Sequence, residues 1–209
     1  MKKKLALAIV AGAVSLTACG SKTDANEKNF GAALSQYFEK KGQLCLNQYE
    51  YSDFPVMVTE MDMRLQKTMQ SGTANQMAAL EAAGLVKCEA ADKGQRCSLT
   101  DAAKPFVRER EATIWGLNGS QKVTQTDLCW GQKGLDKVVK WEGPMKFGDY
   151  QKAGITYTYK VNNLAEWAKK SDVQVAFPVV KSILDGVGNK ESKHTVKLTS
   201  QGWEAKGLD

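Results

Sequence analysis

Four cysteines in the body of the chain constrain its fold more than any other feature, because cross-links limit how its segments can be arranged. They are Cys45, Cys88, Cys97 and Cys129. No two of them form a Cys-x-x-Cys pair, which argues against a zinc ribbon and against a thioredoxin-like redox site. In an oxidising compartment an even number of cysteines indicates two disulfides. Free buried thiols are the alternative.

The start of the chain indicates such a compartment. Lysines at positions 2–4 precede a mostly apolar run, LALAIVAGAVSL, which is the pattern of an export signal. In a helix this run spans about 18 Å, too short for the ~30 Å hydrocarbon core of a membrane. We therefore expect residues 1–18 to be a signal peptide that the mature protein lacks.

A cysteine follows this run directly. Leu16-Thr17-Ala18-Cys19 resembles the lipobox of bacterial lipoproteins. The resemblance implies that the Cys19 thiol receives a diacylglyceryl group and that cleavage leaves an acylated Cys19 as the N-terminus. Two or three acyl chains, palmitate among them, exceed the marginal membrane binding of a single chain. The implied partner of Cys19 is therefore membrane lipid.

The residues after Cys19 bear on the choice of membrane. Gly20 and Ser21 stand where this class places the aspartate that retains proteins at the inner membrane. The resemblance thus implies the periplasmic face of the outer membrane, or the inner or Gram-positive cell membrane in another organism. The whole chain also resembles small uncharacterised proteobacterial envelope lipoproteins, a resemblance that carries over no activity. The segments that carry it are LCWGQ, ITYTYKVNNLAEWA and AFP.

Composition and pattern divide the rest of the chain. We expect a lipidated cysteine and polar tether over residues 19–28, a helical region with a β-hairpin over 29–117, and an antiparallel α+β region over 118–209. Without the signal the chain has 26 basic and 23 acidic side chains, a net charge of +3 instead of +6. The sequence pI near 9.0 is therefore no sign of nucleic-acid binding.

Helical spacing predicts three helices in the first half. One covers residues 30–41 and ends at Gly42, for which we expect the left-handed conformation. Another starts near Asp53. The third opens with the capping-box pattern of residues 73–76 and ends at Gly84. The second of these helices would carry apolar side chains at four-residue spacing: Met57, Met61, Leu65 and Met69.

A β-hairpin follows over residues 85–100, with a turn signal at 91–94. Cys88 and Cys97 lie symmetrically about this turn, so their Cβ atoms would be about 4.5–5.5 Å apart. We therefore expect a Cys88–Cys97 disulfide, and by elimination a Cys45–Cys129 disulfide between the two halves.

The second half predicts a small antiparallel sheet with a helical crossover. Strands are expected over residues 123–130, 135–142, 155–161 and 194–199. Helices are expected from Asn163, carrying Trp167, and over residues 178–185. Helices followed by an antiparallel sheet indicate the α+β class.

Helix, hairpin and Leu-Thr-Asp at residues 74–101 resemble a winged-helix fragment of bacterial regulators. Residues 69–86 contain no lysine or arginine. A helix that enters a DNA groove needs cations for phosphates and donors for bases. We therefore expect a winged-helix-like hairpin and no nucleic-acid partner.

Catalytic patterns are missing from the sequence. His194 is the only histidine, which excludes a site with two histidine ligands, and we expect it to be a satisfied side chain at the edge of the core. There is no Gly-x-Ser-x-Gly elbow, no Ser-x-x-Lys and no Gly-rich phosphate loop. Glu109 and Glu111 lie in an RERE run that indicates a solvated face. We expect no catalytic residue, no metal and no cofactor.

Methionines and tryptophans are the candidates for a binding surface. Methionine fills irregular cores, but it also forms adaptable apolar grooves for a partner helix or a lipid-like ligand. The tryptophans pose the same choice, although Trp141 is expected in the core on one strand face with Leu135 and Val139. The five candidate methionines are Met57, Met61, Met63, Met69 and Met77, and the tryptophans are Trp115, Trp130, Trp141, Trp167 and Trp203.

These observations favour a non-enzymatic, lipid-anchored envelope protein that acts through contacts with an envelope protein partner. A binding module for a small apolar or glycan ligand is the first alternative, for which a deep apolar pocket would be the sign. A carboxylate-based hydrolase is the second, and it would need a carboxylate with a shifted pKa in a cleft.

Overall fold

The computed structural model describes residues 21–46, 54–116, 119–148 and 150–208. Its fold is mixed α+β and mostly sheet, which confirms the expected class at that level. The helices are α1 (Glu27–Lys41), α2 (Glu60–Leu65), α3 (Thr73–Ala82), α4 (Ser171–Ala176) and α5 (Pro178–Asp185), with 3₁₀ helices η2 (Asp101–Phe106) and η3 (Glu166–Lys169). The strands are β1 (Gln43–Cys45), β2 (Val56–Thr59), β3 (Val86–Ala91), β4 (Gly94–Leu99), β5 (Val107–Gly116), β6 (Gly119–Phe147), β7 (Tyr150–Asn162), β8 (Ser192–Thr199) and β9 (Gly202–Ala205).

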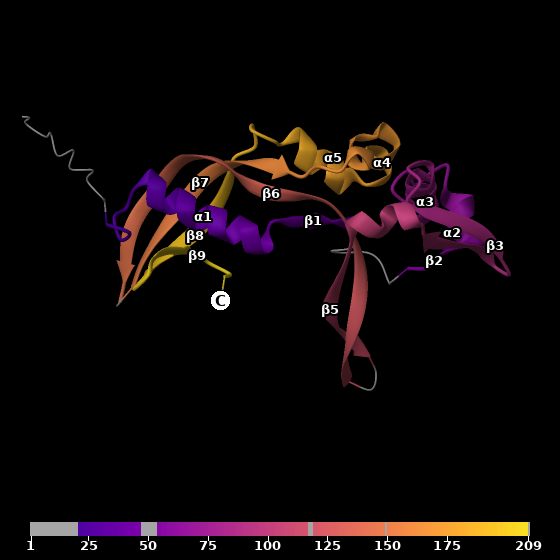
Figure 1. Ribbon diagram of the computed structural model, residues 1–209, viewed down its shortest axis with the longest axis horizontal. Helices are drawn as coiled ribbons and strands as arrows, with labels where there is room; N and C mark the ends of the chain where they lie inside the picture. The colour runs from indigo at the N-terminus through magenta and orange to yellow at the C-terminus, as the bar shows by residue number, and fades with distance from the viewer. Residues whose placement is uncertain (1–20, 47–53, 117–118, 149, 209) are drawn as a thin grey trace, which may run out of the picture.

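The strands form two antiparallel sheets. The larger sheet has the order β1-β6-β7-β8-β9, and the smaller has the order β2-β4-β3. Strand β6 pairs with β5 through its first third, with β1 near its middle and with β7 beyond. The two strands predicted over residues 123–130 and 135–142 are therefore one strand. Its first part forms an arm with β5 that projects from the rest of the molecule (Figure 1).

Helix α1 lies across one face of the larger sheet. Phe30, Leu34 and Phe38 are buried there against Ile155 of β7 and Trp203 of β9. The helix predicted over residues 30–41 is confirmed and begins three residues earlier, where the Asn26 side chain accepts a hydrogen bond from the Asn29 amide at 2.9 Å. The contact between α1 and this face forms one of the two hydrophobic cores of the molecule.

Gly42 ends α1 in a way that the sequence did not predict. Its φ is −83°, so the expected left-handed conformation is wrong. A Cβ at this position would meet the carbonyl oxygens of Phe38 and Lys133. Glycine is required because the backbone of β6 passes close to the helix end.

The helix predicted from Asp53 is also wrong in its first part. Residues 56–59 form strand β2, in which Val56 and Val58 are buried. The helix starts only after Thr59, whose hydroxyl accepts from the Asp62 amide while the Asp62 carboxylate accepts from the Thr59 amide. This capping box sets the boundary between strand and helix.

Helix α3 and the β3–β4 hairpin confirm the predictions for residues 73–83 and 85–100. Gly84 follows the helix with φ of +80°. The cap of α3 differs from the prediction: Gly72 is the N-cap and makes no side-chain hydrogen bond. Cys88 and Cys97 are register partners and form a disulfide.

The second disulfide joins Cys45 of β1 to Cys129 of β6, the pairing expected by elimination. Residues from both sides of the expected boundary at 117/118 share the core. Leu80 of α3 and Trp130 of β6 belong to one buried cluster, and Phe30 packs with residues of β7 and β9 in the other. Because the two halves share their cores, they form a continuous structure.

The helical elements that follow β7 are shorter than predicted. Asn163 has φ of 50°, and the 3₁₀ helix η3, with Trp167, and the short helix α4 follow it. Helix α5 has the predicted bounds, and β8 begins two residues before the predicted strand. The crossover packs α4 against α3. It therefore joins the larger sheet to the part of the molecule that contains α3 and the β2-β4-β3 sheet.

The N-terminal segment is held to the sheet from Ser21 onward. The indole N–H of Trp203 donates to the carbonyl oxygens of Thr23 and Asp24, both at 3.1 Å. The polar tether expected through residue 28 is therefore corrected: α1 already includes residues 27 and 28. In the described part of the chain, no helix combines the length and apolarity needed to cross a membrane.

Candidate functional site

His194 lies at the edge of the α1 core, as expected. Its Nε2 is 2.9 Å from the carbonyl oxygen of Lys206, and its ring centre is 4.4 Å from that of Tyr37. Because a carbonyl oxygen can only accept, Nε2 carries the proton. These two contacts give His194 a structural role at this edge of the core.

The carboxylates of the RERE run lie on the exposed β5 arm. Glu109 and Glu111 are exposed. The Arg110 guanidinium instead reaches the buried Asp127 carboxylate of β6 at 2.7 Å. This ion pair braces the base of the arm, and it leaves one Asp127 oxygen, Oδ1, without a hydrogen-bond partner among the described residues.

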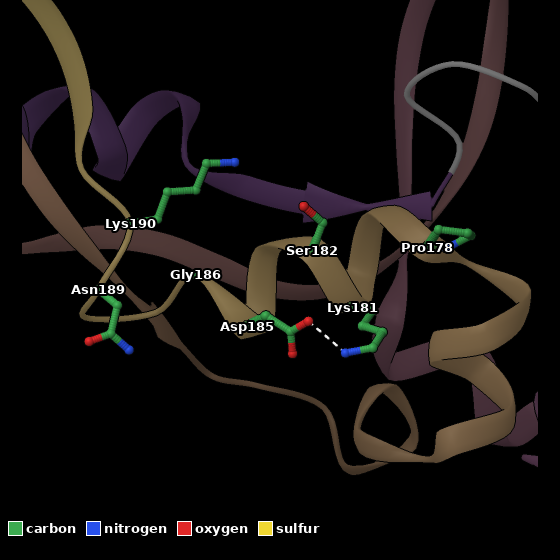
Figure 2. Close-up of a pocket in the computed structure, with 7 residues that line it drawn as sticks. All are labelled: Pro178, Lys181, Ser182, Asp185, Gly186, Asn189 and Lys190. Atoms are coloured by element: carbon green, nitrogen blue, oxygen red, sulfur yellow. Dashed lines mark hydrogen bonds and ion pairs between the residues drawn. The ribbon is translucent and has the colours of Figure 1, made fainter.

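A depression of about 520 Å³ lies beside α5 and the loop after it (Figure 2). Lys181 and Asp185 form an ion pair at 2.6 Å on one side of the helix, whereas Ser182 and Lys190 lie on the other side. The serine hydroxyl therefore does not point toward the carboxylate (Figure 2). The arrangement lacks the nucleophile–base contact that covalent hydrolysis needs.

No group of three histidine, cysteine or acidic side chains within the described residues could hold a metal ion. All four cysteines after Cys19 are in disulfides. Cys19 itself lies outside the described residues.

The five candidate methionines separate into two groups. Met77 of α3 is only 2% exposed, and Met63 packs partly buried against the same core. Met57 of β2, Met61 of α2 and Met69 are 47%, 59% and 50% exposed. The last three form what we call the exposed methionine set. Two of the five candidate methionines therefore belong to the core and three to the surface.

Three of the five tryptophans are core residues. Trp141 is 40% exposed, and the side chain of Trp115 lies outside the described ones. The Trp141 ring contacts Phe30, with 5.5 Å between the ring centres. The predicted grouping of Trp141 with Val139 is wrong, because bulges in β6 place Val138 on the core face instead. The buried members are Trp130, Trp167 and Trp203.

Comparisons with known proteins add no assignment. No family model, curated protein or solved structure matches this chain.

Sequence reasoning missed a lysine-rich surface. The face of the larger sheet opposite α1 carries seven lysines and three carboxylates, which we call the outer face. All members except Asp136 follow from the cross-strand register, because paired residues share a face, and Asp136 is placed there by its hydrogen bond with Thr158. The lysines are Lys137, Lys140, Lys152, Lys160, Lys193, Lys197 and Lys206, and the carboxylates are Asp136, Glu142 and Glu204.

Small polar side chains are buried beneath the lysines of the outer face. Thr156 and Thr158 of β7 are buried on it, and the Thr158 hydroxyl donates to Asp136 at 2.7 Å. Lysine stems can cover such small side chains while their ammonium groups stay in water. Lys160 and Lys197, each on the polar side of a predicted strand, were the signal that could have revealed part of this face.

Proposed function

We propose that this protein is a lipid-anchored lipoprotein at the periplasmic face of the outer membrane that acts without catalysis. Acylated Cys19 holds it, and contacts with another envelope protein carry its function. The observation that carries this proposal is the exposed methionine set, which lies in the lobe of α2 and the β2-β4-β3 sheet. This lobe is at the far end of the molecule from the start of α1 (Figure 1).

The chemistry of this set suits a protein partner. Methionine side chains are flexible and polarisable, so they adapt to partner surfaces of different shape. Strand β2 presents Met57 to solvent while its neighbours Val56 and Val58 fill the core. The exposed methionine therefore rests on a firmly packed strand.

We also propose that this lobe is winged-helix-like. The chain order β2-α2-α3-β3-β4 and the sheet order β2-β4-β3 support this. Residues 69–86, which include α3, contain no lysine or arginine, so α3 lacks the cations that a helix in a DNA groove needs, and a protein contact suits the lobe better.

A small apolar ligand is less well supported. Such a ligand needs a concave, mostly apolar pocket. The depression beside α5 is lined instead by charged and amide side chains, among them Lys181, Asp185 and Asn189 (Figure 2).

Site-specific photo-crosslinking in intact cells tests the partner. A photoreactive amino acid at position 57, 61 or 69 should give a crosslinked product of one discrete mass. Val179 of α5 is the matched control, because it is also apolar and 50% exposed. The same product from position 179, or no product from the three methionine positions, would contradict the proposal.

Mass spectrometry of the mature protein tests the anchor. Wild-type protein should begin at an acylated Cys19 and fractionate with membranes. The Cys19→Ser variant should lose the acyl mass and leave the membrane fraction. A Cys19→Ser protein that is still acylated and still membrane-bound would exclude the lipobox assignment.

A further inference from the structure

We propose that the end of the outer face nearest the N-terminus binds anionic phospholipid headgroups. This inference rests on the proposed anchor for its biological meaning, but its physical basis is a separate set of residues. The anchor would bring the protein to a membrane, and this surface would orient it there.

The covalent path places the anchor next to this surface. The segment from Ser21 is fixed to Trp203, and the carbonyl oxygen of Lys22 lies against Gly202 at the β8–β9 turn. Cys19 is two residues before Ser21, so its Cα is at most about 7 Å from that of Ser21. An acylated Cys19 would therefore bring lipid headgroups to this end of the sheet.

The side chains at this end have the chemistry of a membrane interface. A depression of about 400 Å³ is lined by Tyr150, Lys152, Lys197 and Lys206, among others. Tyr150 is 51% exposed, and the Lys152 ammonium lies 4.8 Å from the centre of its ring. Tyrosine favours the headgroup level of a bilayer, and lysine is attracted to anionic lipids.

The register of the strands concentrates positive charge here. Lys152 of β7 lies directly opposite Lys197 of β8, with Met145 of β6 and Glu204 of β9 at the two ends of this cross-strand row. Two lysines and one carboxylate leave this row with a net positive charge. An anionic headgroup is attracted to such a row more strongly than a zwitterionic one.

Flotation with vesicles tests this surface without the acyl chains. The mature chain from residue 19, carrying Cys19→Ser, is mixed with phosphatidylcholine vesicles that contain either no or about 30% phosphatidylglycerol. We expect at least about tenfold stronger partitioning onto the phosphatidylglycerol vesicles at low salt, and most of this difference should disappear at about 0.5 M salt.

Two triple variants of equal charge locate the binding. Lys152→Gln, Lys197→Gln and Lys206→Gln together should abolish most of the preference for phosphatidylglycerol. Lys40→Gln, Lys67→Gln and Lys93→Gln together are the control, because these lysines are exposed and lie outside the outer face. Circular dichroism and thermal unfolding verify that both triple variants fold.

Each outcome has a separate meaning. Equal partitioning onto both kinds of vesicle would overturn the inference, and so would an equal loss in both triple variants, because net charge alone would then explain binding. The test is independent of the anchor: a failed acylation result at Cys19 leaves the vesicle result standing, and a failed vesicle result leaves the anchor standing.

Discussion

Lys133 of β6 lies over an aromatic ring and is repelled by the charge of a second lysine. Its ammonium is 4.1 Å from the centre of the Tyr159 ring. Burial, together with the positive charge of Lys190, lowers the pKa of Lys133 below its ordinary value of 10.5. Since the unfolded chain then binds more protons between the folded pKa and 10.5, the free energy of unfolding rises with pH across that interval.

Removing the neighbouring charge should reverse part of this shift. We expect Lys190→Gln to raise the pKa of Lys133, because one repulsive cation is lost. An NMR titration of protein labelled at the lysine side chains measures it. Lys181→Gln is the control, since Lys181 is paired with Asp185 at 2.6 Å. An unchanged pKa in Lys190→Gln would show that burial alone lowers it.

At the scale of elements, β6 determines the shape of the molecule. Its register with β7 shifts between Leu135 and Lys137, between Val138 and Lys140, and between Glu142 and Met145. Each of the first two shifts inserts one residue, so the side chains that face α1 recur at every third position instead of every second. The strand also needs glycine where it passes close to β7. A Cβ on Gly131 would lie 2.8 Å from Cγ1 of Val161.

Two glycine substitutions in paired strands test this close approach. Gly131→Ala should lower the free energy of unfolding by about 1–3 kcal/mol, because the added Cβ would overlap Cγ1 of Val161 and force that side chain to shift. Gly154→Ala of β7 should change it by less than about 0.5 kcal/mol, since a Cβ there meets nothing within 4 Å. Urea denaturation measures both. Equal effects of the two substitutions would contradict the proposed contact.

At the scale of the whole molecule, the two disulfides link cysteines at very different separations along the chain. Cys88–Cys97 closes a short hairpin, with a sequence separation of 9 residues. Cys45–Cys129 has a sequence separation of 84 residues and links β1 to the middle of β6. The arm, the larger sheet and the lobe of α2 and the β2-β4-β3 sheet meet there (Figure 1). The longer cross-link restricts the unfolded chain more strongly.

Removing the disulfides one at a time should therefore give unequal losses. We expect the Cys45→Ala, Cys129→Ala pair to lower the free energy of unfolding by about 4–5 kcal/mol. The Cys88→Ala, Cys97→Ala pair should lower it by about 2–3 kcal/mol, from the dependence of loop-closure entropy on loop length. Guanidinium denaturation of both variants gives the comparison. A larger loss for the hairpin disulfide would exclude loop length as the dominant effect.

The sequence by itself determined the elements whose causes are local. Helix α1, the β3–β4 hairpin with its disulfide, and α5 follow from spacing, turn residues and helix ends that act within a few positions. A local pattern also suggested the α+β class, which the structure has. The apolar alternation of β7 was likewise readable, although the strand extends beyond the predicted bounds.

Only the tertiary structure decided which faces are covered. It joined two predicted strands into β6, held the N-terminal segment against Trp203, and separated the buried Met77 from the exposed Met61. It also gathered lysines from β6, β7 and β8, together with Lys206 after β9, on the outer face. The physical reason is that burial and register depend on partners far along the chain. One inserted bulge residue reverses the side-chain pattern that follows it. A sequence pattern of a few residues does not show where the distant partner strand lies, so it cannot predict which face is buried.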